Sequence, residues 1–134
     1  MKTRLSDNFT LEEFSKTSAP YDNVIDFREY IDNIKYGVIH ILQPARDKIN
    51  SPIKINSGFR NILVNAYFGG AKNSQHLTGC AADITCSKEH FQELIYYLRH
   101  NPYVDQLLTA PTWCHVSWSP HRPPRHDIHI NYYL

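Results

Sequence analysis

Two side chains that could bind a metal ion, His76 and Asp83, lie seven positions apart in the middle of the chain. Gly79 and Ala81–Ala82 lie between them, and such small residues let the backbone turn tightly and bring the two side chains toward one point. A third ligand could come from His115, in a segment whose alternating pattern predicts a strand. Two neutral imidazoles and one carboxylate, with a fourth position left to water, are a ligand set of catalytic zinc sites.

Each of these residues also has an ordinary structural interpretation. A single histidine is more often a surface residue or a hydrogen-bonded core residue than a ligand. Asp83 precedes the apolar Ile84 and could cap a turn that leads into a strand, and His115 could be an ordinary strand residue. Spacing alone therefore leaves the metal site and the structural roles open.

The composition narrows the class of protein. The chain has 134 residues, of which 42% are hydrophobic and 20% charged, which predicts a single folded domain over residues 1–134 and argues against disorder. Lys and Arg number 14 against 13 Asp and Glu, so there is no basic field for nucleic-acid binding. Eight histidines point to metal or proton chemistry, because imidazole serves both.

Targeting and redox features are also informative. The longest uncharged apolar stretch, around Val38–Leu42, is far too short to cross a bilayer, so we expect no membrane insertion. The first 20 residues lack the continuous apolar core of a signal peptide, and we therefore expect the protein to be cytoplasmic as synthesised. Three cysteines, an odd number, argue against a disulfide framework. We also expect a monomer.

The helices that must position the candidate ligands follow from the hydrophobic periodicity. Thr10 and Glu13 have the spacing of a capping box and predict the start of a short helix. Apolar residues at helical spacing predict the main helix over Tyr21–Asn50, which Pro44 could break. A further helix is predicted from Ser87 to about His100.

Strands dominate the last third of the chain. Alternation at Ile53 and Ile55 predicts a first short strand, and Arg60–Gly79 is expected to form a short helix followed by a structured loop. Later strands are predicted at Val104–Thr109, Trp113–Trp118 and Ile128–Leu134. The first two of these are close enough to form an antiparallel hairpin. Helices followed by mostly antiparallel strands predict an α+β fold, with a central sheet flanked by helices.

Three motifs contain the candidate ligands: Ser57-Gly58-Phe59-Arg60, Ser74-x-His76-x-x-Gly79-x-Ala81-x-Asp83 and Trp113-x-His115-Val116-Ser117. Together they resemble the zinc D-alanyl-D-alanine carboxypeptidases, a peptidase family with a hedgehog-like fold. Two further segments are similar to the small single-domain branch found in bacteria and their phages: Leu5-Ser6-x-Asn8-Phe9-Thr10-Leu11-x-Glu13-Phe14 and Asp105-Gln106-Leu107. The resemblance covers most of the chain, from about Leu5 to Trp118.

This resemblance implies roles for five residues. It makes His76, Asp83 and His115 the ligands of a Zn²⁺ cofactor. It places Arg60 near a substrate carboxylate or carbonyl, which suits the fixed fork of a guanidinium, and Ser74 where its hydroxyl could bond substrate backbone. Arg60 could instead be a solvated loop residue, and Ser74 could simply stabilise a turn.

The activity that the resemblance implies is zinc-dependent hydrolysis of amide bonds in peptidoglycan peptide stems. The enzyme would be a D-Ala-D-Ala carboxypeptidase or an endopeptidase of the endolysin kind. Because no export signal is expected, it would reach the cell wall only if a partner released it.

One catalytic group of the family is missing. A Glu or Asp usually stands just upstream of the last ligand, where it takes a proton from the metal-activated water, but the corresponding position here is Ala110. Asp127 and His129, on one face of the last predicted strand, could replace it, as could Asp105 at the start of an earlier strand. The substrate or a second water could also carry the proton, so the catalytic base is unknown.

The missing carboxylate keeps two other functions open. One is a catalytically impaired, zinc-containing module that binds cell-wall peptides, and the other is a phage structural protein with a vestigial site. Near the ligands, Cys80 and Cys114 are expected to be core residues and not zinc thiolates. The basic segment His121–His126 could hold an anionic glycan or peptide, or could be an exposed connector.

Overall fold

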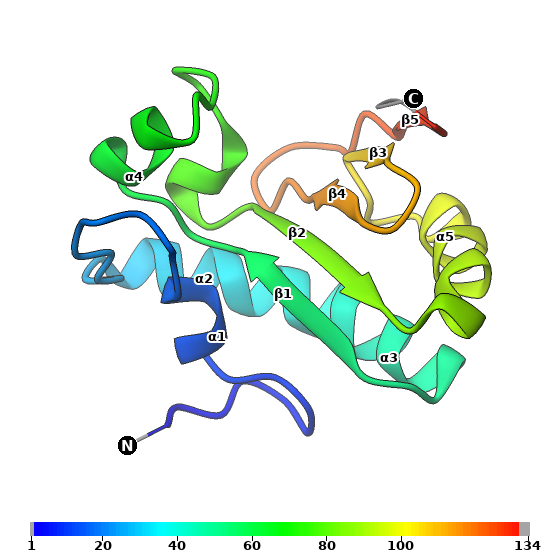
Figure 1. Ribbon diagram of the computed structural model, residues 1–134. Coiled ribbons are helices and arrows are strands. Elements are labelled where there is room, and N and C mark those ends of the chain that lie inside the picture. Colours follow the sequence, from blue (N-terminus) through cyan, green and yellow to red (C-terminus); the bar gives the residue numbers. More distant parts are fainter. Residues whose placement is uncertain (1, 132–134) are drawn as a thin grey trace.

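A five-stranded mixed sheet forms the centre of the molecule in the computed structural model, which describes residues 2–131 (Figure 1). In chain order the strands are β1 (Ile53–Ser57), β2 (Ala81–Cys86), β3 (Gln106–Thr109), β4 (Cys114–Ser117) and β5 (Asp127–His129). Their order across the sheet is β1-β2-β4-β3-β5. Neighbours are antiparallel except β3 and β5, which are parallel. The predicted α+β fold with a mostly antiparallel sheet is confirmed.

Helices cover one face and one end of this sheet (Figure 1). They are α1 (Glu12–Ser15), α2 (Arg28–Gly37), the π-helical turn η1 (Val38–Leu42), α3 (Gln43–Ile49), α4 (Ile62–Tyr67), the short 3₁₀ turns η2 (Gln75–Thr78) and η3 (Lys88–His90), and α5 (Phe91–His100). Within residues 2–131, no helix is long and apolar enough to cross a membrane. The predicted short helix after Thr10 and the helix ending at His100 are confirmed.

The core lies between the sheet and the α2–α3 helix. Trp118 is fully buried there, and its ring lies so close to Gly37 that a Cβ at this glycine would stand 2.1 Å from a ring atom. The indole Nε1 also donates a hydrogen bond to the Asn33 carbonyl at 2.8 Å. This contact fixes the end of β4 on α2, because a buried indole needs both close packing and a partner for its N–H.

The main helix starts later than predicted, at Arg28 and not at Tyr21. Residues 21–27 are not helical, and Val24 and Phe27 are 66% and 61% exposed. The buried Asn23 explains the difference, because its amide donates to the Phe59 carbonyl at 2.7 Å and accepts from the Asn61 N–H at 2.9 Å. This segment is therefore bound to the loop before α4 instead of continuing the helix.

Pro44 does not break the helix. The chain passes it through the π turn, where the Gln43 N–H donates to Val38, five residues back. Because Pro44 has no N–H, the carbonyl of His40 loses its usual helical partner. The Asn101 side chain replaces that partner at 3.1 Å.

The predicted strands agree best with the structure where apolar and polar side chains alternate along the sequence. The first strand and the β3–β4 hairpin are confirmed. β2 was not predicted as a strand, because Ala81 and Ala82 give no alternating signal. The last strand, predicted over Ile128–Leu134, is shorter and covers Asp127–His129, and its end at residues 132–134 lies outside the described part of the chain.

Candidate metal centre

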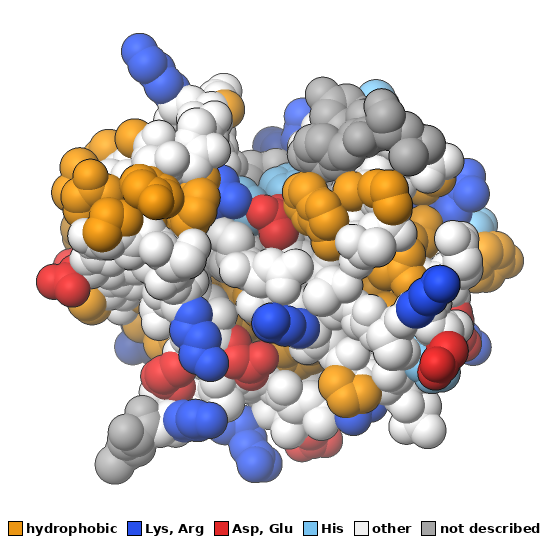
Figure 2. Space-filling model, in the orientation of Figure 1, with side chains coloured by type: hydrophobic (Ala, Val, Ile, Leu, Met, Phe, Trp, Pro, Cys, Tyr) orange, Lys and Arg blue, Asp and Glu red, His pale blue; other side chains and the backbone are white. Residues whose placement is uncertain are grey.

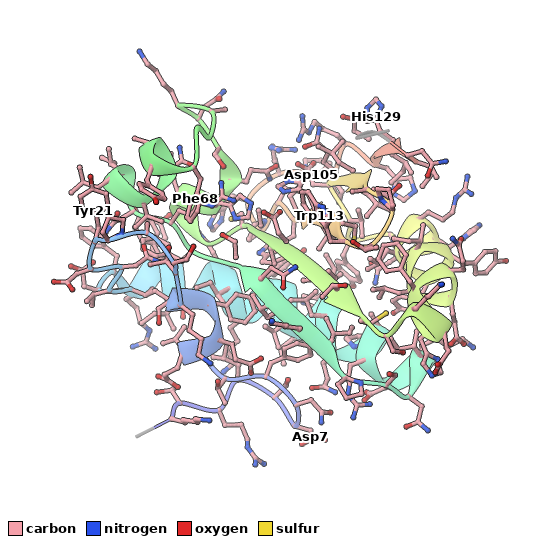
Figure 3. The ribbon with its side chains drawn as sticks, in the orientation of Figure 1. Asp7, Tyr21, Phe68, Asp105, Trp113 and His129 are labelled. Atoms are coloured by element: carbon pink, nitrogen blue, oxygen red, sulfur yellow. The ribbon has the colours of Figure 1, made fainter. Side chains whose placement is uncertain are left out.

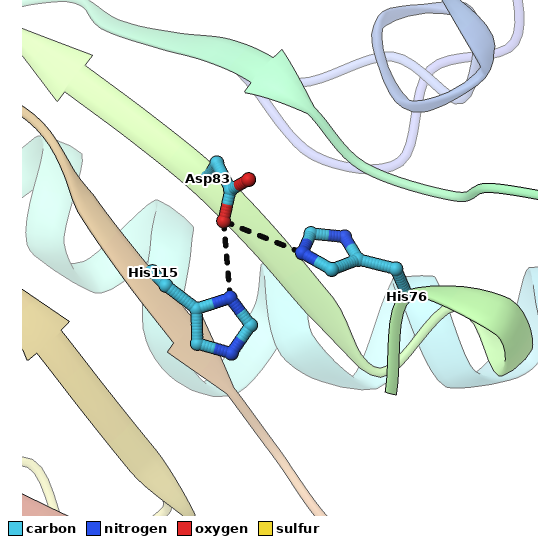
Figure 4. A group of neighbouring side chains, drawn as sticks. All are labelled: His76, Asp83 and His115. Carbon is cyan, nitrogen blue, oxygen red and sulfur yellow. Dashed lines mark hydrogen bonds and ion pairs between the residues drawn. The ribbon is translucent and has the colours of Figure 1, made fainter. Parts of the chain in front are cut away.

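The three predicted metal ligands converge on one point (Figure 4). Asp83 lies in β2 directly opposite His115 of β4, and His76 comes from η2. One oxygen of Asp83, Oδ1, lies 3.0 Å from His115 Nδ1 and 3.3 Å from His76 Nε2. Residues from three separate segments therefore present a carboxylate and two imidazoles to a common centre.

The local backbone explains how His76 and Asp83 meet. Gly79 ends η2 with a positive φ of 78°, a conformation that favours glycine. A Cβ at this position would also lie 2.8 Å from the Tyr30 carbonyl. Ser74 stabilises the start of the same turn, since its hydroxyl accepts from the His76 N–H at 3.2 Å. The small residues between the two ligands thus allow the sharp turn that the sequence suggested.

The donor set fits a zinc ion. His76 is 3% exposed, and its Nδ1 lies 2.7 Å from the Gly58 carbonyl, an acceptor that places the proton on Nδ1 and leaves the Nε2 lone pair toward Asp83. Two ligand atoms at about 2.1 Å from a tetrahedral zinc stand about 3.4 Å apart. The separations of 3.0 and 3.3 Å at Asp83 Oδ1 are close to that value.

Arg60 holds the other oxygen of the same carboxylate. Its Nη2 lies 3.0 Å from Asp83 Oδ2, and its Nε donates to the Ser57 hydroxyl at 2.9 Å. Burial by itself would raise the pKa of Asp83, but its contacts with His115 and His76 outweigh burial and hold that pKa well below its ordinary value. Asp83 is therefore a charged, oriented carboxylate, and Arg60 is bonded to a ligand instead of being a solvated loop residue.

The cluster lies in a cavity of about 540 Å³. Arg60 and Ser74 line it together with the three predicted ligands, so the structure brings all five predicted site residues to one place. Figure 2 shows acidic and histidine side chains at the floor of a hollow between two raised parts of the surface. In Figure 3, Asp105 and Trp113 lie on one side of the region and Phe68 lies on the other.

None of the three proposed bases, Asp105, Asp127 and His129, is among the residues that line the cavity of the metal cluster. Among the described residues, Asp83 is the only carboxylate that lines the cavity. Ala110 follows β3, and its N–H donates to the Trp113 carbonyl at 2.9 Å. Alternation along β3 places Ala110 on the same side of the sheet as Leu108, which pairs with His115. A carboxylate at position 110 would thus point to the face that carries the ligands.

The proposed replacements for this base are held elsewhere. Asp127 and His129 lie on the edge strand β5, where Asp127 Oδ1 is 2.8 Å from His129 Nε2. Leu108 of β3 stands between His129 and His115 in the register. Neither Asp127 nor His129 is among the residues that line the cavity, and their catalytic role stays a prediction.

Asp105, the third proposed base, is fully buried and bound to arginines. The guanidinium groups of Arg122 and Arg125 both donate to its carboxylate, with shortest distances of 2.9 Å. Burial would raise the pKa of Asp105, but these hydrogen bonds outweigh burial and hold the pKa well below its ordinary value. A carboxylate so strongly held in its charged form is a poor proton acceptor at neutral pH.

Among the side chains that surround this carboxylate, Gln75 had no role predicted from the sequence, whereas Arg122 and Arg125 lie in the basic segment that could hold an anionic glycan or peptide. Gln75, Arg122 and Arg125 all line the cavity. Gln75 stands inside the His76 motif, and the arginines stand in the basic His121–His126 segment. The basic charge of this segment is visible in the sequence, but only the fold shows that its two arginines lie at the cavity of the metal cluster.

Cys80 and Cys114 are core residues, as expected. All three thiols are free, and Cys80 and Cys114 are buried. Burial raises the pKa of both thiols, so neither is a thiolate at neutral pH. Cys114 also neighbours His115 on β4, and adjacent strand residues point to opposite faces.

Comparison with known proteins adds the family. The family model for Peptidase M15 matches residues 7–117, which include all three candidate ligands. A zinc D-Ala-D-Ala carboxypeptidase from Streptomyces albus G is 36% identical over 58 residues. That alignment covers 43% of this chain and 23% of the relative, so the chain matches less than a quarter of the relative's length. Because the family model covers most of the chain, this protein belongs to the peptidase M15 family.

Proposed function

We propose that this chain is a zinc metallopeptidase that hydrolyses amide bonds in the peptide stems of peptidoglycan. The observation that carries the proposal is the convergence of His76, Asp83 and His115 at the floor of an open cavity. Membership of a peptidase family supports hydrolysis of an amide. The similarity to a zinc D-Ala-D-Ala carboxypeptidase supports both the metal and a substrate that contains D-amino acids.

The chain's own residues prepare the site for this reaction. When bound, a zinc ion lowers the pKa of a water molecule and polarises the amide carbonyl. Arg60 engages Asp83 Oδ2 and so leaves Oδ1 to face the metal. The Gly58 carbonyl fixes the ring of His76, as a second layer of hydrogen bonds does in metal sites. Trp113 and Leu108 supply apolar side chains to the cavity wall.

A direct assay tests the proposal. Zinc-loaded protein is incubated with purified peptidoglycan fragments, and new amines are sought by mass spectrometry. We expect cleavage by the wild type, and loss of at least about 100-fold in His76→Ala, because a ligand matters more than the outer partners whose loss costs 10–100-fold. The matched control is His90→Ala, which removes a half-exposed histidine outside the cavity. Intact zinc binding without any cleavage would contradict the proposal.

A second function, a zinc-containing module that binds cell-wall peptides without cutting them, is favoured by Ala110. The variant Ala110→Glu separates the two functions, because a positioned general base contributes about 10²–10⁴-fold to rate. An active wild type that gains little from Ala110→Glu already has a base. A wild type that binds stem peptides but cuts only as Ala110→Glu is the binding module. Far-UV circular dichroism checks that this variant folds.

The proposal also includes the type of peptidase and its biological role. Carboxypeptidase and endopeptidase action differ in whether the released amine belongs to a single amino acid or to a longer peptide, and the same mass spectra separate them. An endolysin role further requires cleavage of intact cell walls and not only of isolated fragments. A phage structural protein with a vestigial site would show neither stoichiometric zinc nor cleavage.

A further inference from the structure

A second charged cluster shares the cavity with the metal ligands. Its centre is Asp105, whose side chain is fully buried just before β3. Arg122 donates to both carboxylate oxygens at 2.9 Å, Arg125 donates through its backbone N–H at 2.8 Å and its Nη2 at 2.9 Å, and Gln75 Nε2 donates at 3.1 Å. A buried carboxylate with this many donors keeps its charge and fixes the groups around it.

The two arginines extend from this anchor into the cavity wall. Both line the cavity, and their side chains stay 47% and 49% exposed. Pro123 and Pro124 stand between them in the sequence, which restricts the backbone that carries them. Each arginine side chain therefore remains partly open to solvent, while its guanidinium is held in place by Asp105.

The charges around the cavity leave an excess that suits an anion. Arg60 is paired with Asp83, whereas Arg122 and Arg125 share the single charge of Asp105. Among the described residues that line the cavity, three are arginines and one is a carboxylate, and Asp127 of β5 also attracts Arg125 from outside the lining. Guanidinium groups bind carboxylates through paired N–H donors, and part of this cluster is open to solvent.

Gln75 links this wall to the metal ligands. Its Nε2 donates to Asp105 and, at 3.0 Å, to the Trp118 carbonyl, and its Oε1 lies 3.4 Å from Arg125 Nη2. The next residue is His76. The arginine pair and the metal cluster are thus held at a constant separation, as recognition of a substrate group beside a reacting bond requires.

We propose that Arg122 and Arg125, anchored by Asp105, form a subsite that binds a free carboxylate of the peptide substrate. This inference rests on the proposed function, because it assigns one group of the substrate of that site. It makes the two arginines specificity-determining residues, which orient the peptide so that its scissile amide lies at the metal cluster.

The test measures binding without turnover. Two probes are titrated calorimetrically into the zinc-loaded protein: N-acetyl-D-alanyl-D-alanine with a ketomethylene group in place of its scissile amide, and the same molecule with a C-terminal carboxamide. We expect the acid to bind wild type at least about tenfold more tightly than the amide, since hydrogen bonds between charged groups are the strong ones. In Arg122→Gln and Arg125→Gln the ratio should fall below about threefold.

Two further variants keep the test decisive. Arg28→Gln removes an equal charge from an 88% exposed side chain on α2 and should leave the ratio unchanged. Arg125→Lys retains the charge and should recover part of the preference even if Arg125→Gln folds poorly. Equal binding of acid and amide by wild type, or a ratio that neither glutamine variant lowers, would overturn the inference.

Failure of the proposed function gives a different result. It would appear as no cleavage of the parent amide peptides, while the preference for the acid probe persists. Cleavage of acid and amide substrates with equal KM would instead contradict the carboxylate subsite and leave the peptidase intact.

Discussion

Asp83 and Asp105 are carboxylates with different partners: Asp83 lines the cavity, whereas Asp105 is buried behind two arginines that line it. Asp83 lies in β2 with two imidazoles on one oxygen and Arg60 on the other. Asp105 lies just before β3 and is surrounded by Arg122, Arg125 and Gln75. Hydrogen bonds hold the pKa of both carboxyls below the ordinary value.

The difference lies in what the partners can release. A neutral imidazole can exchange its hydrogen bond for a bond to a metal ion, so the cluster at Asp83 can accept a cation at its centre. A guanidinium cannot lose its proton, so Asp105 stays paired and cannot serve as ligand or base. One carboxylate is therefore available for chemistry, and the other fixes the wall beside it.

Replacing Asp83 should abolish the response of the protein to zinc, because it removes a proposed ligand. Binding of a metal to the folded state alone raises stability by about 2.7 kcal/mol at 100 times the dissociation constant. We expect zinc to raise the melting temperature of wild type by several degrees and to leave Asp83→Asn unchanged. Thermal unfolding with and without zinc measures this effect. Asp32→Asn, at an exposed position of α2, is the control, and an equal zinc effect in Asp83→Asn would contradict the assignment.

Replacing Asp105 should affect stability and not zinc. Removing one partner of a buried ionic cluster costs about 3–5 kcal/mol. We expect Asp105→Asn near the lower end, about 3 kcal/mol, because Arg122 and Arg125 are half exposed and can still be hydrated. Urea unfolding measures the change. If the free energy of unfolding fell by less than about 1 kcal/mol, or if a folded variant lost zinc binding, the two carboxylates would not have the different roles assigned to them.

Arg60 should have a smaller effect on the metal than the ligands do. It orients Asp83 from behind, and such outer partners typically contribute 10–100-fold to metal affinity. We expect Arg60→Gln to weaken zinc binding about tenfold, as measured by competition with a chelator. Arg99→Gln, an exposed arginine of α5, should have no effect. Unchanged affinity in Arg60→Gln would assign Arg60 to the substrate alone.

The pH dependence of stability should show the smallest difference. Because the folded-state pKa of Asp105 lies below the unfolded value of about 3.9, its contribution is present above that pH and is lost as the pH falls through the folded-state pKa. We expect the unfolding free energy of Asp105→Asn to fall less than that of wild type between pH 6 and pH 3. Urea midpoints at the two pH values provide the comparison, and parallel losses would speak against this role.

The two regions also differ in how far the sequence predicted them. The motif around His76 and Asp83 is local, since seven positions and a glycine with positive φ bring the two ligands together. The cluster at Asp105 is not local, because it joins Gln75 to arginines about 50 positions later. Such a contact depends on the parallel pairing of β5 with β3, and no hydrophobic pattern in the sequence specifies that pairing.

The errors in secondary structure have similar causes. Val24 and Phe27 have helical spacing, but the buried amide of Asn23 holds their segment outside the helix. β2 begins with Ala81 and Ala82, which are both buried, and so it lacks the large alternating side chains that identify a strand in a sequence. In both places tertiary contacts outweigh local pattern.

Zinc titration of the metal-free protein by isothermal calorimetry tests the central claim most directly. We predict one zinc ion per chain for wild type, and no measurable binding for His115→Ala at concentrations that saturate wild type. His100→Ala, an exposed histidine of α5, should bind as wild type does. Absence of stoichiometric binding by wild type, or equal binding by His115→Ala, would contradict the assignment of His76, Asp83 and His115 as the metal centre.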